Sequence, residues 1–225
     1  MTSNQEKNII NSWFQNAKPW ISAVQNEEIE SRKLITNQAI IDVIAEKAPK
    51  NVLDVGCGEG WLCREINAMG IQAHGIDLVP ELIAEAQSKG GGTFQVLTYN
   101  ELAQGVLKEK YELVVCNFSL LGEESVEQAF QGMKHILANN GHFIIQTIHP
   151  IAGCGDEKYE DGWRKGSWKG FSNDFTNPAP WYFRTQENWQ ALFQKHEIPL
   201  IEMIEPIHPQ SGNHASLILI GKLTK

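Results

Sequence analysis

The sequence predicts an α/β fold with a doubly wound, mostly parallel sheet, and two observations lead to this prediction. An apolar, β-branched run, Val52–Val55, is followed by a glycine-rich loop and by a helical pattern that begins near Trp61. Strand and helix patterns then alternate along the chain at intervals of about thirty residues. In such sheets ligands bind at the carboxyl ends of the strands. The functional residues are therefore expected at those ends.

In the first half of the chain, helices are expected both before and after the glycine-rich loop in the sequence. Residues 8–48 carry apolar side chains at helical spacing, and Pro19 is expected to separate the first helix from the segment after it. Gly70 ends the first crossover helix, and Pro80 begins the second. The expected elements after the loop are the helix 61–68, the strand 72–77, the helix 80–88 and the strands 93–97 and 113–116.

The second half completes the predicted sheet. A helix over 123–138 has its apolar residues at helical spacing and is closed by the sequence Asn139-Asn140-Gly141. Thr185 is the expected N-cap of a further helix that reaches His196. The remaining expected elements are the strands 142–147, 198–205 and 215–221.

The glycine-rich loop predicts a particular kind of ligand. Its glycines, which free the backbone for close contact with a ligand, stand at alternate positions: Gly56, Gly58 and Gly60. A dinucleotide-binding loop has the spacing G-x-G-x-x-G and binds a pyrophosphate. Here Trp61 stands where that third glycine would fall, and two carboxylates, Asp54 and Glu59, flank the turn. These features disfavour a nicotinamide dehydrogenase and suit a ligand with a positively charged end.

A second acidic residue predicts that this ligand also contains a ribose. The apolar run Gly75-Ile76-Asp77-Leu78 ends the next expected strand with a carboxylate, about twenty residues after the loop. From that position a carboxylate binds both hydroxyls of a ribose. A ribose, a cationic end and no phosphate describe S-adenosylmethionine (SAM).

At these residues the chain resembles the class I SAM-dependent methyltransferases. The resemblance rests on Val52–Gly60, Gly75–Leu78 and Tyr111–Asn117, and it covers about residues 45 to 150 closely. It implies a seven-stranded Rossmann-like sheet whose last two strands form an antiparallel pair. The ends of the chain resemble a narrower group of small bacterial-type methyltransferases that share the sequence Trp-Tyr-Phe-Arg after an insertion.

The resemblance implies one methyltransferase domain over residues 1–225. Its expected parts are N-terminal capping helices (1–45), a SAM-binding core (46–150), a lid or acceptor insertion after the fifth strand (151–184) and a C-terminal helix with strands (185–225). At 225 residues and 42% apolar content, the chain is long enough for one full core with a small lid.

The resemblance also implies a set of cofactor-binding residues. Thr98 takes the place of the residue that binds the adenine amino group, and Tyr99 either flanks the adenine or is a plain turn residue. The Asn117 carbonyl is expected near the SAM amine. Arg32 either folds over the SAM carboxylate or is a solvated helix charge. The remaining expected cofactor residues are Asp54, Gly56, Cys57, Gly58, Gly60, Asp77 and Leu78.

His149 and Tyr182 are the candidates for a catalytic base. His149 follows the fifth strand, and a histidine there titrates near neutral pH. It can equally bind an acceptor oxygen or satisfy the turn before Pro150. The spacings of the histidines match no metal-ligand motif, so no metal is expected.

The insertion is rich in aromatic residues, which predicts a functional lid rather than a disordered linker. Its aromatic faces suit a planar or apolar acceptor, and its arginines suit a carboxylate. The alternative is that these residues form the lid's own small core, and lid packing is also expected for Trp13 and Trp20. The candidate substrate-binding residues are Trp163, Arg164, Trp181 and Arg184, with Tyr182 beside them.

Net charge, the cysteine pattern and the length of the apolar runs limit the classes of partner and the compartment that are expected. A net charge of −8 disfavours nucleic acid. The four cysteines show no C-x-x-C pairing, and no apolar run is long enough for a membrane span, so a cytoplasmic protein with reduced thiols is expected. The expected partner is a small-molecule acceptor. Two alternatives stay open: a protein or RNA methyltransferase, and a non-catalytic SAM-binding regulatory domain.

Overall fold

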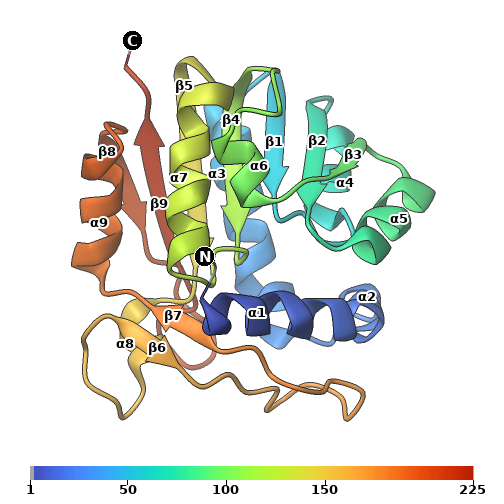
Figure 1. Ribbon diagram of the computed structural model, residues 1–225, viewed down its shortest axis with the longest axis vertical. Coiled ribbons are helices and arrows are strands. Elements are labelled where there is room, and N and C mark those ends of the chain that lie inside the picture. The colour runs from blue at the N-terminus through green and yellow to red at the C-terminus, as the bar shows by residue number, and fades with distance from the viewer. Residues whose placement is uncertain (1–2, 225) are drawn as a thin grey trace.

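A seven-stranded sheet forms the centre of the molecule. The computed structural model describes residues 3–224, and in it the strands follow the order β3-β2-β1-β4-β5-β9-β8. The first five are parallel, and β9 runs antiparallel to both of its neighbours. This confirms the expected Rossmann-like sheet (Figure 1). The strands are β1 (Asn51–Val55), β2 (Gln72–Asp77), β3 (Thr93–Val96), β4 (Tyr111–Asn117), β5 (Leu137–Thr147), β8 (Leu200–Ile204) and β9 (Leu217–Lys222).

Helices cover both faces of the sheet because alternate residues of each strand point to opposite sides. On β4, Leu113 and Val115 face one core, and Val114 and Cys116 face the other. The first core is covered by α3 (Asn37–Lys47), α4 (Trp61–Ala68) and α5 (Pro80–Lys89). The second is covered by α6 (Tyr99–Ala103), α7 (Glu124–Ile136) and α9 (Gln186–Lys195). The central strands β1, β4 and β9 are buried on both faces, as their continuous apolar runs indicate, whereas the edge strands β3 and β8 are partly exposed.

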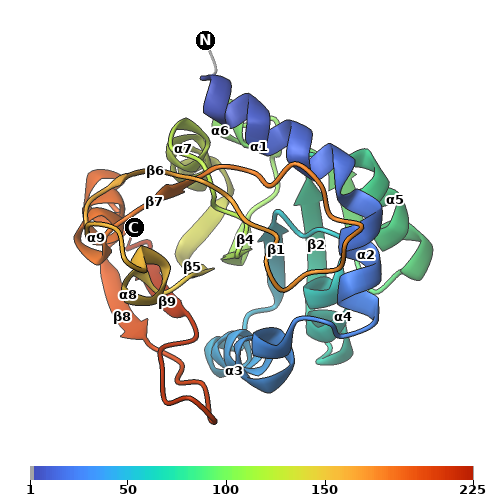
Figure 2. The ribbon, with the colours of Figure 1, turned by 90° about the horizontal axis from the view of Figure 1, so that it is seen from below.

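The N-terminal helices lie across the carboxyl ends of the parallel strands (Figure 2). They are α1 (Asn4–Gln15) and α2 (Ala17–Gln25), followed by a π-helical turn, η1 (Arg32–Thr36). Pro19 does not separate two helices as expected. The break falls at Asn16, and Pro19 lies in the first turn of α2, where backbone N–H groups have no helical partner and a proline removes no hydrogen bond.

The insertion after β5 forms a short helix and a hairpin. The helix is α8 (Pro150–Cys154), and the hairpin pairs β6 (Gly162–Arg164) with β7 (Trp181–Phe183). Between the two hairpin strands, residues 165–180 form a segment that we call the lid loop. Figure 2 shows this orange segment crossing the carboxyl ends of the strands toward α1 and α2. None of the helices in residues 3–224 is both long and apolar enough to cross a membrane.

Two boundaries differ from the sequence prediction. The segment after β3 is the helix α6 and not a turn, because Thr98 and Glu101 form a reciprocal capping box at its start. Strand β5 begins at Leu137, directly after α7, although a strand was expected only from 142. A register shift between Tyr111 and Leu113 of β4 accommodates the residues that were expected to form a loop.

Candidate active site

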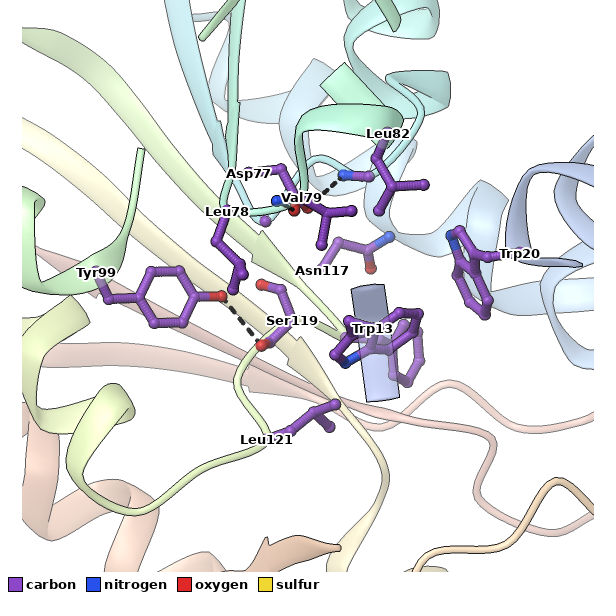
Figure 3. A pocket seen from close by; sticks show the side chains of 13 residues that line it. Trp13, Trp20, Asp77, Leu78, Val79, Leu82, Tyr99, Asn117, Ser119 and Leu121 are labelled. Carbon is purple, nitrogen blue, oxygen red and sulfur yellow. Dashed lines mark hydrogen bonds between the residues drawn. The ribbon is translucent and has the colours of Figure 1, made fainter. Parts of the chain in front are cut away.

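A cleft lies where β1, β2 and β4 end, and residues of α1 and α2 also line it (Figure 3). Its empty space is about 590 Å³, a figure that includes space open to solvent. The lining comes from the ends of the three strands and the loops after them, from the N-terminal helices, and from the starts of α5 and α6. The lining residues are Trp13, Trp20, Gly56, Gly58, Asp77, Leu78, Val79, Leu82, Tyr99, Asn117, Phe118, Ser119 and Leu121.

The glycine loop needs its glycines for two different reasons. Gly56 has a φ of +79°, and a Cβ on it would lie 2.3 Å from Cβ of Ser119. Gly58 has a φ of +57°, but the nearest atom to an added Cβ is Nε1 of Trp20, at 3.5 Å. Gly56 therefore permits close packing of β1 against the loop after β4. Gly58 leaves its backbone bare on the side of the cleft.

Asp77 is held by main-chain groups at the edge of the cleft. Its Oδ2 accepts from the Gly58 N–H and its Oδ1 from the Val79 N–H, both at 2.9 Å. Burial raises the pKa of this carboxyl, and these hydrogen bonds oppose the rise. A carboxylate has about four lone-pair sites, so both oxygens keep capacity for ligand hydroxyls. The carboxylate expected to bind the ribose is thus oriented before any ligand binds.

Two further carboxyls are buried under the glycine loop. Asp54 is 2% exposed and Glu59 is fully buried. Oδ1 of Asp54 and Oε1 of Glu59 have no hydrogen-bond partner among residues 3–224. Burial first, and then the charge of Asp77, raises the pKa of Asp54 to about 7. Arg64 pairs with the other oxygen of Glu59. Neither acid lines the cleft.

The other cofactor candidates divide into two groups. Leu78, Tyr99 and Asn117 line the cleft, and the Tyr99 hydroxyl donates to the Ser119 carbonyl at 3.0 Å. Thr98 does not line it, because its hydroxyl donates to Glu101 in the capping box of α6. Also outside the lining are Asp54, Cys57, Gly60 and Arg32.

Arg32 is not a solvated helix charge. Its guanidinium lies over the rings of Trp20 and Trp61, 5.7 and 4.8 Å from their centroids. Its Nε donates to Oδ1 of Asn37 at 3.1 Å. Burial lowers the pKa of Arg32 to about 10, and the charge of Glu59 opposes this shift. Arg32 therefore holds a partly buried positive charge beside the glycine loop, in a neighbouring hollow that Trp61 and Arg64 also line.

His149 lies away from the cleft lining. Its ring is fully buried, its Nε2 is 2.9 Å from Oε1 of Glu205, and its Nδ1 accepts from the Ile151 N–H at 3.2 Å. Since Nδ1 accepts, the neutral ring carries its proton on Nε2 and donates it to Glu205. Neither nitrogen then has a free lone pair. A role as base requires the contact with Ile151 to open.

The structure brings His149, Glu205 and His214 together, which the sequence spacing did not indicate. One ligand atom from each residue lies within 4.8 Å of the others. However, the two imidazole rings are stacked, with centroids 4.1 Å apart and planes at 11°. A metal ion binds in the plane of an imidazole, so two parallel rings cannot both direct a lone pair at one ion. Metal binding here would require one ring to turn.

The hairpin residues are engaged mainly with the protein itself. Arg184 is buried and donates to the carbonyls of Gly122 and Glu123, at 2.7 and 3.2 Å. Arg164 donates to two main-chain carbonyls and pairs with Glu157. Trp163 and Tyr182 pack edge to face, and Trp181 packs in the same way on Phe183. Burial raises the pKa of the Tyr182 hydroxyl. None of these residues lines the cleft.

The sequence interpretation missed part of the lining. Trp13 and Trp20, expected to pack in a lid, also face the cleft, with their rings perpendicular and 5.2 Å apart. Ser119 and Leu121 were missed although they follow the end of β4, a position where ligands bind in this class of sheet. That positional rule was the available signal. Among the residues that the structure describes, no basic side chain lines the cleft.

Buried polar contacts fasten the lid loop to α1. The Asn16 side chain donates to the Thr176 carbonyl and accepts from the Thr176 N–H, at 2.8 and 2.9 Å. The Ser12 hydroxyl donates to the Asn177 carbonyl at 2.6 Å. Trp168 of the lid loop packs edge to face on Trp13. The cover of the cleft therefore combines segments from distant parts of the chain.

Comparison with known proteins agrees with this geometry. A family model described as "Methyltransferase domain" matches residues 30–199. The ubiquinone biosynthesis O-methyltransferase of Cupriavidus pinatubonensis is 28% identical over 113 residues, which are 48% of this chain and 45% of that protein. The demethylmenaquinone methyltransferase of Thermus thermophilus is 27% identical over 115 residues, 49% of this chain and 52% of that protein. The chain thus matches these curated relatives over about half of their length.

Solved structures share the fold. The 1,6-didemethyltoxoflavin-N1-methyltransferase of Burkholderia thailandensis, solved with S-adenosylhomocysteine, has a TM-score of 0.69 and 16% identity, covering 100% of this chain and 92% of that chain. A SAM-dependent methyltransferase of Mesorhizobium loti has a TM-score of 0.61 and 18% identity, covering 80% of this chain and 96% of that chain.

Proposed function

The chain belongs to the methyltransferase domain family, and from this premise we propose that it transfers the methyl group of SAM to a small-molecule acceptor. The observation that carries the proposal is the shared cleft. The bare glycine loop, the oriented Asp77 carboxylate and the two perpendicular tryptophans all face one space at the carboxyl edge of the sheet.

The residues present fit SAM. Asp77 would bind the ribose hydroxyls, and the apolar side chains of Leu78, Val79 and Leu82 would contact the adenine. The buried charges of Asp54 and Glu59 would favour the ammonium group, and Arg32 would favour the carboxylate. When bound, SAM supplies a sulfonium that is already an activated methyl donor.

The protein's own contribution is therefore alignment and exclusion of water. Trp13 and Trp20 cover the cleft, and the lid loop holds α1 over it through Asn16. Proton removal from the acceptor is assigned to His149 or Tyr182 as a proposal. For His149, the proton on Nε2 already has an acceptor in Glu205, so only Nδ1 is able to take a proton, after the Ile151 N–H moves away.

Two features favour an aromatic acceptor over a carboxylate-bearing one. The acceptor side of the cleft offers Trp13, Phe118 and Leu121, which suit a planar, apolar group. Within residues 3–224, no basic side chain lines the cleft to hold a carboxylate, and Arg164 and Arg184 are engaged elsewhere. The names of the ubiquinone and demethylmenaquinone enzymes indicate quinone-related acceptors for those proteins. We propose an acceptor of the same broad class, a small aromatic molecule.

The experiment that tests the proposal uses methyl-labelled SAM and a cell extract divided into small metabolites, protein and RNA. Label transferred to the metabolite fraction by the wild type, and not by Asp77→Ala, supports the proposal and yields a product for mass identification. Label in protein or RNA would instead assign the chain to macromolecule methylation. Binding of SAM with no transfer to any fraction would favour a regulatory SAM-binding domain.

A further inference from the structure

Asn117 is the last residue of β4, and its side chain faces the cleft between Asp77 and Trp13 (Figure 3). Its neighbour across the sheet is Gln146 of β5, which is 1% exposed. A polar residue buried this deeply is stable only when its amide is fully hydrogen-bonded. The contacts of Gln146 determine how Asn117 is oriented.

The orientation of the Gln146 amide is fixed by a main-chain carbonyl. Its Nε2 donates to the Thr36 carbonyl at 3.0 Å, and a carbonyl oxygen only accepts. The opposite end, Oε1, accepts from the Ser216 hydroxyl at 3.0 Å. Exchanging the two ends of the amide would place oxygen against oxygen at Thr36. Nitrogen and oxygen of Gln146 are therefore assigned by their partners.

The orientation of the Gln146 amide in turn determines the orientation of the Asn117 amide. Nε2 of Gln146 also donates to Oδ1 of Asn117, at 2.6 Å, so the oxygen of the Asn117 amide faces the sheet. The nitrogen, Nδ2, then faces the cleft, where Figure 3 shows it directed toward the space between Leu82 and Trp20. No acceptor for Nδ2 is found within residues 3–224. The fold thus presents a hydrogen-bond donor, in one defined orientation, to the ligand.

The position of this donor selects the part of the ligand that it meets. Asn117 ends β4, Gly56 directly follows the neighbouring parallel strand β1, and parallel strands lie about 4.8 Å apart. The ribose belongs at Asp77 on the other side of the glycine loop, so the amino-acid end of SAM belongs beside Asn117. The ammonium group of that end has no lone pair to accept a hydrogen bond, whereas its carboxylate accepts several.

We propose that Nδ2 of Asn117 donates a hydrogen bond to the carboxylate of SAM, and that Gln146 is the positioning residue that makes this donor available. This replaces the expected contact between the Asn117 carbonyl and the amine as the main role of the residue. The inference rests on the proposed function, since it requires SAM in the cleft.

Gln146 has a second connection to the same ligand group. The Thr36 carbonyl that it holds belongs to η1, the turn that also carries Arg32. One buried amide therefore fixes both the orientation of Asn117 and the backbone of the segment that carries the nearby guanidinium. A hydrogen bond to a charged group contributes about 1.5 to 3 kcal/mol, which corresponds to an affinity change of about ten- to a hundredfold.

The test measures calorimetric binding of three ligands that share an adenosine thioether. S-adenosylhomocysteine carries the amine and the carboxylate, 5′-(3-aminopropylthio)-5′-deoxyadenosine carries the amine alone, and 5′-methylthioadenosine carries neither. Asn117→Ala and Gln146→Leu should weaken S-adenosylhomocysteine about ten- to a hundredfold. They should leave the other two ligands within about twofold of wild type. Asn117→Asp should weaken S-adenosylhomocysteine more than Asn117→Ala, since it directs a negative oxygen at the carboxylate.

The control is Asn139→Ala, which removes an exposed amide near the start of β5, the strand that also carries Gln146. It should change none of the three affinities. Retained binding of 5′-methylthioadenosine shows that a variant is folded. Equal losses for all three ligands, a loss shared by both amine-bearing ligands, or no loss at all would overturn the inference. If wild type bound none of the three, the proposed function itself would fail.

Discussion

At the scale of single residues, the site depends on carboxyls that the fold keeps out of water. The pKa of Asp54 is about 7 in the folded protein, against 3.8 for the free side chain, because burial and Asp77 disfavour its charge. The folded state thus binds this proton more tightly than the unfolded chain. Stability from this group is present at low pH and is lost as pH rises from about 4 through 7.

Asp54→Asn removes this ionisation, so the unliganded variant should be more stable than wild type at pH 8 by on the order of a few kcal/mol. The difference should shrink at pH 5, where the wild-type carboxyl is already protonated. Urea unfolding at the two pH values measures it. The same variant should bind S-adenosylhomocysteine more weakly at pH 8, since it removes a negative charge near the ammonium. A stability difference that is equal at both pH values would contradict the shifted pKa.

Asp77 gives the second prediction at this scale. Asp77→Ala removes the acceptor for two ribose hydroxyls and also frees the N–H groups of Gly58 and Val79. Two hydrogen bonds to a charged group contribute together about 3 kcal/mol or more, so S-adenosylhomocysteine should bind at least about a hundredfold more weakly. Titration calorimetry measures this, with the exposed Asp174→Ala as control. Unchanged affinity would remove the ribose assignment.

These residues also show which parts of the site are readable from sequence. The positions of Asp77 and the glycines at the edge of the sheet were predictable because they follow from local strand and turn geometry. The direction of the Asn117 amide was not, since it depends on the pairing of β4 with β5 and on the carbonyl of Thr36. The engagement of Arg184 with two carbonyls depends in the same way on how distant segments pack.

At the scale of elements, a carboxylate of α1 caps α7. Oε1 of Glu6 accepts from the N–H groups of Glu123, Glu124 and Ser125, at 2.7, 2.8 and 3.2 Å. These are donors that α7 itself leaves without partners, and a negative charge is favoured at a helix N-terminus. The cap comes from a residue far away in sequence, so it holds α1 against the core.

Glu6→Ala should lower the free energy of unfolding by about 1 to 2 kcal/mol, as loss of a helix cap does. Glu6→Gln should cost less, because its amide oxygen still accepts although the charge is gone. Urea unfolding measures both, and the exposed Glu124→Gln serves for comparison. Because α1 carries Trp13, weaker S-adenosylhomocysteine binding is expected to accompany the change. If Glu6→Ala were as stable as wild type, the contact would not be a cap in solution.

The elements differ in how far sequence predicts them. The core strands and helices were predictable because each is long and has a clear apolar period. Helix α6 was missed although its capping box, Thr98 with Glu101, is visible in the sequence. The docking of the lid loop on α1 had no local signal, because Asn16 and Thr176 are ordinary polar residues until the fold brings them together.

At the scale of the whole molecule, the two segments that cover the cleft come from opposite parts of the chain and act on one site. Helices α1 and α2 place Trp13 and Trp20 over the glycine loop, and the lid loop packs Trp168 on Trp13. Of these two segments, α1 and α2 line the cleft directly, whereas no described residue of the lid loop does. A ligand that stabilises these helices should therefore stabilise the lid loop as well, through the contacts with Asn16.

Amide hydrogen exchange tests this coupling. S-adenosylhomocysteine should slow exchange in residues 4–25 and also in residues 165–180, because opening of either segment exposes the other. In Asn16→Ala the ligand should still protect residues 4–25, while the added protection of 165–180 should largely disappear, since the Thr176 contacts are gone. Asn8→Ala, an exposed substitution in α1, should behave as wild type. Equal protection of the lid loop in Asn16→Ala and wild type would mean that the loop contacts the ligand itself, and the acceptor pocket would then extend to the lid loop.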